Sequence, residues 1–191
     1  MTLGDFFSGV LEIEDTLLIQ DLCEISKIVE PKKGELLIRI GEEQKGLLFL
    51  IEGICRGYFV AEDGREVTDS FIHRCGTPMM TGHAIDGAAV VNLIAETDVK
   101  CVRVEVQPLM RRLSESAILM RLQNQMFMKS LEEQVKMKHV MCFERAKARY
   151  LWFLDNYEGL IDVVRHKDIA SFLGIEPESL SRIRKQLAAK P

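Results

Sequence analysis

Short apolar runs broken by turn residues fill the chain from about Ile28 to Val106. Runs such as "ELLIRI", "GLLFLIEG" and "NLIAET" mix aliphatic and β-branched residues, and glycines recur between them. The dipeptide Asp63-Gly64 between two such runs is a strong signal of a tight β-hairpin. Closely spaced short strands predict an antiparallel sandwich or barrel with one face of each sheet buried. An amphipathic stretch from about Glu14 to Ser26 predicts one helix beside it.

A long stretch without glycine follows, from about Pro108 to Cys142. It is rich in Leu, Met, Gln, Glu and Lys, which are good helix formers. Pro108 suits the first turn of a helix, and Ser114 is placed to cap a second helix after a short break. The long helix is therefore expected at about 114–142. A helix of roughly 27 residues spans about 40 Å, which is more than one small sheet can cover.

The apolar positions of this long helix need a partner surface. They recur at spacings of four or five, at Ile118, Leu122, Met126, Leu131, Val135 and Val140. We predict a parallel two-fold dimer with Ile118, Leu122 and Met126 in its seam. The alternative is a helix that lies across its own domain. The methionines indicate core packing and not a cofactor site.

After Phe143 the pattern predicts three further helices, at 144–156, 167–173 and 177–187, with an extended piece in "YEGLIDVV" between the first two. The last two helices are separated by only a short turn. Such an arrangement predicts a helix-turn-helix, in which certain positions are forced by the close crossing of two short helices.

These forced positions are filled by suitable residues. Ala170 supplies a small side chain where the second helix crosses the first, and Gly174 tolerates the positive φ of the turn. Pro177 suits the first turn of the second helix, where its missing N–H is harmless. The shared core is expected from Ile169, Leu173, Ile175, Leu180 and Ile183. An ordinary helical hairpin has the same apolar spacing and is the alternative.

The remaining face of the second helix carries side chains that can bind DNA. They are Glu178, Ser179, Arg182, Arg184 and Lys185. Such side chains donate to or accept from base edges and phosphates in a major groove. We therefore predict that this helix reads DNA.

Composition limits the classes of protein to consider. The chain has 191 residues, of which 47% are apolar and 28% charged, as in globular proteins with one large domain or two small ones. Its first residues show neither a basic leader nor a long apolar run, so we expect a cytoplasmic protein without a membrane segment.

The net charge of −4 is unevenly spread along the chain. From Phe143 onward there are nine Lys and Arg against seven Asp and Glu, whereas the rest has sixteen against twenty-two. This asymmetry fits an acidic regulatory body with a basic reading end. A basic terminal helix also arises simply because cations favour helix C-termini.

Two stretches near the C-terminus, "ERAKARYLWFLDNY" and "IASFLGIEPESLSRIRKQL", resemble bacterial regulators of the Crp/Fnr family. Upstream, "KKGELLIRIGEE", "LLFLIEGICRGYF" and "EDGREVT" resemble that family's cyclic-nucleotide-binding β-roll. The resemblance implies an α+β fold with an antiparallel, cupin-like β-roll for an effector, a long dimerisation helix and a small all-α helix-turn-helix domain. It places the domains at 1–142 and 143–191. In the family motif a Glu and an Arg four residues apart contact bases, and Glu178 and Arg182 match them, with Ser179 beside the Glu.

The sequence departs from the family at the nucleotide pocket, where an Arg-Ser or Arg-Thr pair binds the cyclic phosphate. If Thr97 marks the matching strand, Ala89 and Val90 stand in those places, and no Lys or Arg occurs between Arg74 and Lys100. A phosphate buried without a cation is strongly disfavoured, so cyclic AMP or GMP is not expected to bind in the family manner. The effector, if there is one, is unidentified. Its pocket is expected to be more apolar and to include Gly82, His83, Val90, Val91 and Asn92.

A second departure is the short end of the chain. Most of the family follows the reading helix with a β-hairpin wing, whereas only "AAKP" follows it here. The partners that the resemblance implies are double-stranded DNA, a second copy of the chain, a small effector and, as a further candidate, RNA polymerase. The main rival is a dimeric ligand-sensing or protein-interaction module that does not bind DNA.

Other chemistry finds little support in the sequence. The five cysteines lack a C-x-x-C pair and are interpreted as free thiols. His73 and His83 lack the H-x-H arrangement of cupin metal sites, and His73 near Cys75 is better explained as two loop residues than as a haem ligand. There is no P-loop or dinucleotide fingerprint. We therefore expect neither an enzyme nor a bound metal or cofactor.

Overall fold

The structure is a computed structural model that describes residues 1–82 and 84–188. The chain forms two compact units. The first contains Met1–Tyr58 and Phe71–Met126, and the second contains Phe59–Ser70 together with the chain from Phe127 onward.

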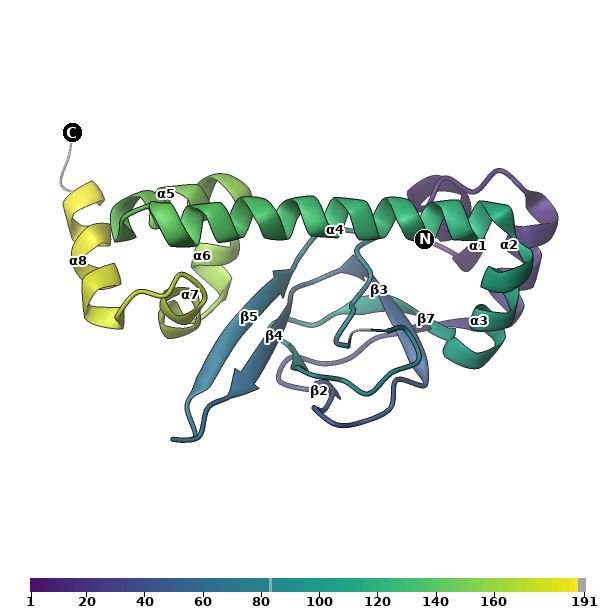
Figure 1. The fold of residues 1–191 in the computed structure, drawn as a ribbon, viewed down its shortest axis with the longest axis horizontal. Coiled ribbons are helices and arrows are strands. Elements are labelled where there is room, and N and C mark those ends of the chain that lie inside the picture. The colour runs from purple at the N-terminus through teal and green to yellow at the C-terminus, as the bar shows by residue number, and fades with distance from the viewer. Residues whose placement is uncertain (83, 189–191) are drawn as a thin grey trace. The chain divides into compact units, whose positions relative to one another are not determined.

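Within the described residues, seven strands form two antiparallel sheets, which confirms the predicted β-architecture. One sheet has the strand order β1-β7-β3 and the other β2-β6-β4-β5 (Figure 1). The strands are β1 (Ser26–Val29), β2 (Leu36–Ile38), β3 (Gly46–Glu52), β4 (Cys55–Val60), β5 (Glu66–Ile72), β6 (Asn92–Ala95) and β7 (Lys100–Glu105). Asp63-Gly64 lies in the predicted turn between β4 and β5, with Gly64 at φ +82°.

Two apolar cores lie on opposite faces of the β1-β7-β3 sheet. Successive residues of a strand point to opposite faces, and β3 is apolar on both. Leu47 and Phe49 belong to one core, whereas Leu48 and Leu50 belong to the other. The second core fills the space between the two sheets.

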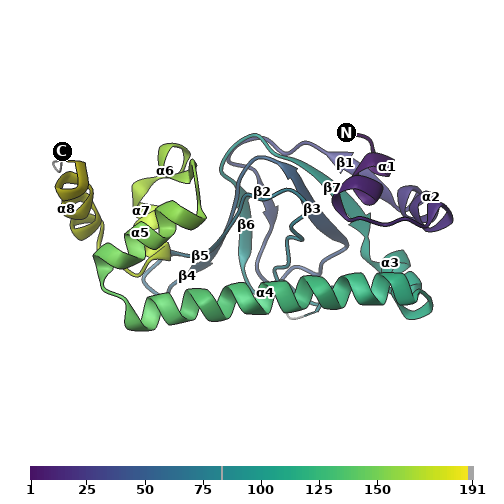
Figure 2. The same cartoon turned by 90° about the horizontal axis from the view of Figure 1, so that it is seen from above.

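Short helices cover the first core. They are α1 (Leu3–Asp5), a π-helix (Phe6–Val10), α2 (Thr16–Glu24) and α3 (Val106–Glu115). Figure 2 shows α1 and α2 near β1, and α3 following β7. The helix predicted between Glu14 and Ser26 is α2, and Asp15 caps it by accepting hydrogen bonds from two backbone N–H groups.

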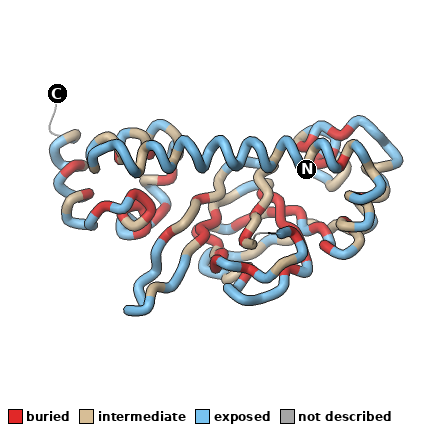
Figure 3. The backbone as a smooth tube through the Cα atoms, viewed as in Figure 1, coloured by how far each residue is buried: buried red, intermediate tan, exposed pale blue. Residues whose placement is uncertain are grey.

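The long helix α4 spans Ala117–Phe143 and confirms the helix predicted at about 114–142. Its start differs from the prediction, because Ser114 belongs to α3, where its hydroxyl donates to Arg111 O at 2.6 Å. The prediction that Ser114 caps the long helix was therefore wrong. Ser116 has that role, since its Oγ accepts from Leu119 N–H at 3.3 Å. Figure 3 shows that most of α4 is exposed.

Up to residue 188, the second unit contains four further helices. They are α5 (Ala146–Asn156), α6 (Leu160–Val163), α7 (His166–Phe172) and α8 (Pro177–Ala188). The prediction of an extended piece in "YEGLIDVV" was wrong, because this stretch contains the helix α6. This helix begins after Gly159, which has φ +76°. The ring of Phe153 stacks on Tyr157 with centroids 5.0 Å apart and contributes to the core of this unit.

Candidate nucleic-acid interface

The predicted helix-turn-helix is formed by α7 and α8 (Figure 1). Gly174 lies in the turn with φ +60°, a backbone conformation that other residues seldom adopt. Ala170 is fully buried, and Pro177 is the first residue of α8. All predicted core residues are buried: Ile169, Leu173, Ile175, Leu180 and Ile183.

Arg149 of α5 supports this turn, a role that the sequence did not reveal. Its Nη1 donates to Leu173 O at 3.1 Å, and its Nε donates to Glu144 O at 2.9 Å. A Cβ at Gly174 would lie 3.4 Å from the same Nη1. Carbonyls at the end of a helix lack intrahelical partners, so Arg149 satisfies one of them from α5, which lies two helices earlier in the chain.

The exposed side of α8 brings together most of the predicted DNA contacts. Glu178, Arg182 and Lys185 are exposed and share one face, because they lie four and three residues apart. Ser179 is half-buried beside them. In this structure the Arg182 guanidinium lies along its own helix, where Nη2 donates to Ser179 Oγ at 3.1 Å and Nε donates to Glu178 O at 3.4 Å.

Arg184 lies on a different side of α8 from this row. Its side chain is half-buried, and Nη1 lies 2.8 Å from Nδ1 of His166. Arg184 and His166 line a cavity of about 560 Å³ between α5, α6 and α8. Lys185 reaches the edge of the same cavity. Arg184 is thus placed beside the reading row and not within it.

The part of the β4–β5 hairpin that belongs to the same unit, Phe59–Ser70, contacts α7 and the residue before it through β5. Thr68 N–H donates to Ser171 Oγ at 3.0 Å, and Glu66 forms an ion pair with Arg165 at 3.6 Å. Arg165 also pairs with the buried carboxylate of Asp168 at 2.6 Å. These contacts fix the first helix of the helix-turn-helix, and no sequence pattern had indicated them.

In the first unit, the stretch from Thr81 to Asn92 is tied to the β2–β3 connection. Ala89 is buried; its N–H donates to Glu42 O at 2.9 Å, and its carbonyl accepts from Gly41 N–H at 2.7 Å. Val90 N–H donates to Thr81 O at 2.6 Å. The backbone groups around Ala89 are therefore already paired within the protein.

The residues predicted to line the effector pocket lie in this stretch. Gly82 is half-buried, Val90 is exposed, and Val91 and Asn92 are buried. The Oδ1 atom of Asn92 accepts a hydrogen bond from Ile40 N–H at 2.9 Å, so this side chain joins β6 to the segment after β2. His83 lies outside the described residues. That these residues form an effector pocket stays a prediction.

Arg56 on β4 is a fully buried cation in the roll. Its Nε donates to Glu96 Oε1 at 2.6 Å, and its guanidinium lies 4.7 Å from the centroid of the Tyr58 ring. Burial of a charge is tolerated when a partner neutralises it. The carboxylate of Glu96 thus already occupies the place that an anionic ligand of Arg56 would need.

Two thiols lie between the sheets. Burial raises the pKa of Cys55 to about 12 and the pKa of Cys101 to about 11. Since the thiolate is the reactive form, these two cysteines are structural. Cys75 and Cys142 are exposed free thiols.

The predicted dimer seam has a different environment from the one expected. Leu122 and Met126 are partly buried and pack against the first core of their own chain. The premise that this face of α4 lacks cover within one subunit was therefore wrong for these two residues. Ile118 is half-buried. Another row on α4 is exposed instead: Met120, Phe127, Leu131 and Val135, at 44–59% exposure.

Two further properties limit the chemistry. Among residues 1–82 and 84–188, no group of three or more His, Cys, Asp or Glu side chains is placed to hold a metal ion. Nor does this part of the chain contain a helix both long and apolar enough to cross a bilayer.

The chain contains, in order, an antiparallel β-roll, a long helix and a helix-turn-helix. The family model of the cyclic nucleotide-binding domain matches residues 28–116. This range contains the strands β2 to β7 and the helix α3. No curated protein sequence matches the chain.

Solved structures of Crp/Fnr regulators share the fold. FixK2 from Bradyrhizobium japonicum aligns with a TM-score of 0.74 and 19% identity over 86% of this chain and 85% of its own. A putative Crp/Fnr regulator from Eubacterium rectale aligns with a TM-score of 0.75 and 17% identity over 96% of this chain and 88% of its own. CLP from Xanthomonas campestris, a c-di-GMP-responsive global regulator, aligns with a TM-score of 0.72 and 17% identity over 92% of each chain. The chain therefore has the fold of Crp/Fnr transcriptional regulators, as the sequence resemblance implied.

Proposed function

We propose that this protein is a dimeric, sequence-specific DNA-binding regulator of transcription. The observation that carries the proposal is the row of Glu178, Arg182 and Lys185 on the exposed side of α8, the second helix of a helix-turn-helix. Side chains of these types at this spacing suit a major groove. The proposed place of action is the cytoplasm, where a bacterial regulator meets DNA.

Each side chain has a distinct proposed role. Arg182 donates two hydrogen bonds to guanine O6 and N7, and Glu178 accepts from cytosine N4. To do so, the guanidinium must leave Ser179, its hydrogen-bond partner in the free protein. Lys185 contacts phosphate, and Arg184 reaches phosphate from the side of α8 where it contacts His166.

The proposed dimer is parallel and two-fold, with α4 at its centre. The exposed row that includes Phe127, Leu131 and Val135 supports it, because apolar side chains exposed in a row favour burial against a second copy. Two-fold symmetry places the two reading helices in successive major grooves, about 34–36 Å apart. The operator should therefore be a palindrome.

The effector is proposed to be other than cyclic AMP or GMP bound through a buried phosphate. Ala89 offers no cation, its backbone groups are paired, and Arg56 is neutralised by Glu96. A buried phosphate would therefore lack compensation in this stretch of the roll.

The test is selection of bound sequences from random DNA duplexes, followed by affinity measurements at several salt concentrations. Enrichment of a palindrome, with affinity that falls steeply as salt rises, is the expected result. Recovery of unenriched sequences, or binding that salt leaves unchanged, would instead favour the alternative: a ligand-sensing or protein-interaction module that does not bind DNA.

A further inference from the structure

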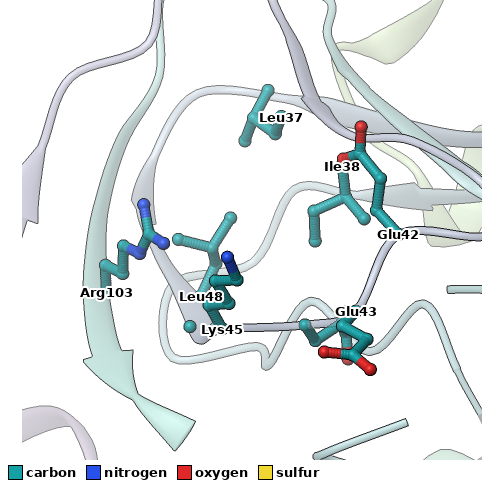
Figure 4. Close-up of a pocket in the computed structure, with 9 residues that line it drawn as sticks. Leu37, Ile38, Glu42, Glu43, Lys45, Leu48 and Arg103 are labelled. Atoms are coloured by element: carbon teal, nitrogen blue, oxygen red, sulfur yellow. The ribbon is translucent and has the colours of Figure 1, made fainter. Parts of the chain in front are cut away.

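A cavity of about 480 Å³ opens between the two sheets of the first unit. Its walls come from β2, the β2–β3 connection, β3 and β7, whereas the predicted effector pocket lies in the stretch from Gly82 to Asn92. Figure 4 shows Leu37 and Ile38 on one wall, and Leu48, Lys45 and Arg103 together on the facing side. The cavity thus combines an apolar surface with two cations.

The apolar surface depends on an irregularity in β2. Leu36 pairs with Ile94 and Ile38 with Leu93, so Leu37 is an extra residue in the ladder. An extra residue of this kind redirects side chains that would otherwise alternate between faces. As a result, the adjacent residues Leu37 and Ile38 line the same cavity, opposite Leu48.

Both cations of the cavity are exposed side chains. Neither Arg103 nor Lys45 makes an ion pair or side-chain hydrogen bond with another described residue. Arg103 also lies directly across the ladder from Lys27 on β1, and like charges in directly opposite positions repel one another. An anion bound by Arg103 would offset that repulsion.

Gly46 allows Arg103 to lie over the cavity. A Cβ at this position would come within 2.8 Å of Arg103 Cγ and closer still to Nε. The missing side chain therefore leaves room for the arginine to cross the neighbouring strand toward Leu48.

The acids nearby do not neutralise this pair of cations. Glu42 pairs with Arg39, at 3.7 Å. Glu43 lines the cavity with its carboxylate turned away from Lys45 in Figure 4. Glu105 follows Arg103 by two residues on β7, and no ion pair joins these two side chains. A cationic site for an external anion remains.

We infer that this cavity binds a small monocarboxylate with an aliphatic body. A guanidinium and an ammonium at the mouth match a carboxylate, and Leu37, Ile38 and Leu48 match an alkyl chain. The volume of about 480 Å³ lies in the usual range for small-molecule sites. This inference concerns ligand binding alone and does not depend on the proposed DNA-binding function.

The position of the cavity gives a route to the stretch around Ala89. Glu42, Glu43 and Gln44 form its rim, and the backbones of these residues pair with Gly87, Ala88 and Ala89. A carboxylate that orders the rim would therefore also order that stretch.

The experiment uses the full chain without DNA. Calorimetry with hexanoate, octanoate and decanoate should give saturable binding at one site, and 1-octanol at equal concentration should not compete. Methyl signals of Leu37, Ile38 and Leu48 should shift in NMR spectra as carboxylate is added. Replacement of Arg103 by Gln should weaken binding about tenfold to a hundredfold, through loss of a charge-assisted hydrogen bond.

Two further variants keep the outcome decisive. Lys45→Gln tests the second cation if Arg103→Gln alters the fold, and Lys33→Gln, an exposed lysine of the same unit away from the cavity, is the matched control. Lys45→Gln should weaken binding, and Lys33→Gln should leave it unchanged. No saturable binding of any of the three carboxylates would overturn the inference, as would equal binding of 1-octanol or equal affinity of the Arg103→Gln, Lys45→Gln and wild-type proteins.

Discussion

Arg182 and Lys185 share one face of α8, yet they should respond differently to removal. A base contact carries sequence information, whereas a phosphate contact does not. Arg182→Ala should weaken binding to the cognate duplex by about 1–3 kcal/mol and relax the preference at one base pair per half-site. Lys185→Ala should weaken all duplexes alike and lower the salt slope by about one.

The measurement is binding of both variants to matched and single-mismatch duplexes over a range of salt. Lys167→Ala on α7 is a suitable control, because this exposed lysine lies outside the reading row. The assigned roles are wrong if Arg182→Ala keeps the full base preference while Lys185→Ala abolishes it.

The buried ion pair between Arg56 and Glu96 should contribute strongly to the stability of the fold. Arg56 is fully buried and Glu96 nearly so. Removal of one partner leaves the other charge without its neutralising group, which typically destabilises a protein by about 3–5 kcal/mol. Glu96→Ala should therefore shift the urea midpoint strongly downward.

Glu132→Ala is the matched control for this prediction. Glu132 pairs with Lys136 on the exposed surface of α4, and this hydrogen bond lowers the pKa of the Glu132 carboxyl. Exposed pairs contribute little to stability, so the midpoint should barely move. Equal shifts of the urea midpoint in the two variants would show that the buried Arg56–Glu96 pair contributes no more to stability than an exposed pair.

Individual residues were predictable from the sequence where a backbone or packing requirement permits few residue types. Gly174, Ala170 and Pro177 are such cases, because a tight turn between two helices restricts each position. Arg149 and Arg56 were not predictable in their roles. Their partners, Leu173 O and Glu96, are brought near only by the tertiary fold.

At the scale of elements, α4 has two apolar faces with different environments. Leu122 and Leu131 are nine residues apart, or two and a half turns, so they lie on opposite sides of the helix. Leu122 packs against the core of its own chain, whereas Leu131 is 56% exposed. A spacing of four or five residues combines both faces into one series.

This difference between the faces gives a prediction for assembly. Leu131→Glu should abolish the proposed dimer with little loss of folded stability, because it places a charge in the seam but in no core. Leu122→Glu should instead lower the unfolding midpoint, since it buries a charge in the roll's own core. Sedimentation and thermal unfolding of both variants separate the two effects.

Met128→Glu is the control on α4, since Met128 is 65% exposed and lies to one side of the row through Phe127 and Leu131. It should disturb the dimer less than Leu131→Glu does. A wild-type chain that sediments as a monomer at micromolar concentration contradicts the proposed assembly. A monomeric Leu122→Glu variant with unchanged stability would instead support the seam predicted from the sequence.

Among the elements, the strands, the long helix and the helix pair α7–α8 were predicted because their patterns are long or strictly placed. The π-helix at Phe6–Val10 and the short helix α6 were not. Both are too short for an apolar period to repeat. The helix α6 further depends on Gly159 at positive φ, which the sequence alone could equally assign to a turn.

At the scale of the whole molecule, the sequence resemblance identified the fold but not the sites for small molecules. That the family's phosphate site is missing stays a prediction from the sequence, which places Ala89 where a cation is needed if Thr97 marks the matching strand. The cavity beside Arg103 could not be predicted, because it depends on the extra residue in β2 and on the approach of β2 to β3 across two sheets.

The hydrogen bonds around Ala89 also determine how fast this part of the roll exchanges protons with water. The amides of Gly41 and Ala89 donate to each other's segments at 2.7 and 2.9 Å, and that of Val90 donates to Thr81 O at 2.6 Å. Amides held in this way exchange only when the segment opens. In deuterium oxide the unliganded protein should therefore protect the amides of Gly41, Ala89 and Val90, whereas the amide of Asp63 at the exposed hairpin tip should exchange early. Addition of cyclic AMP should leave both exchange rates unchanged, so the local opening of this part of the roll should stay the same at every concentration of cyclic nucleotide.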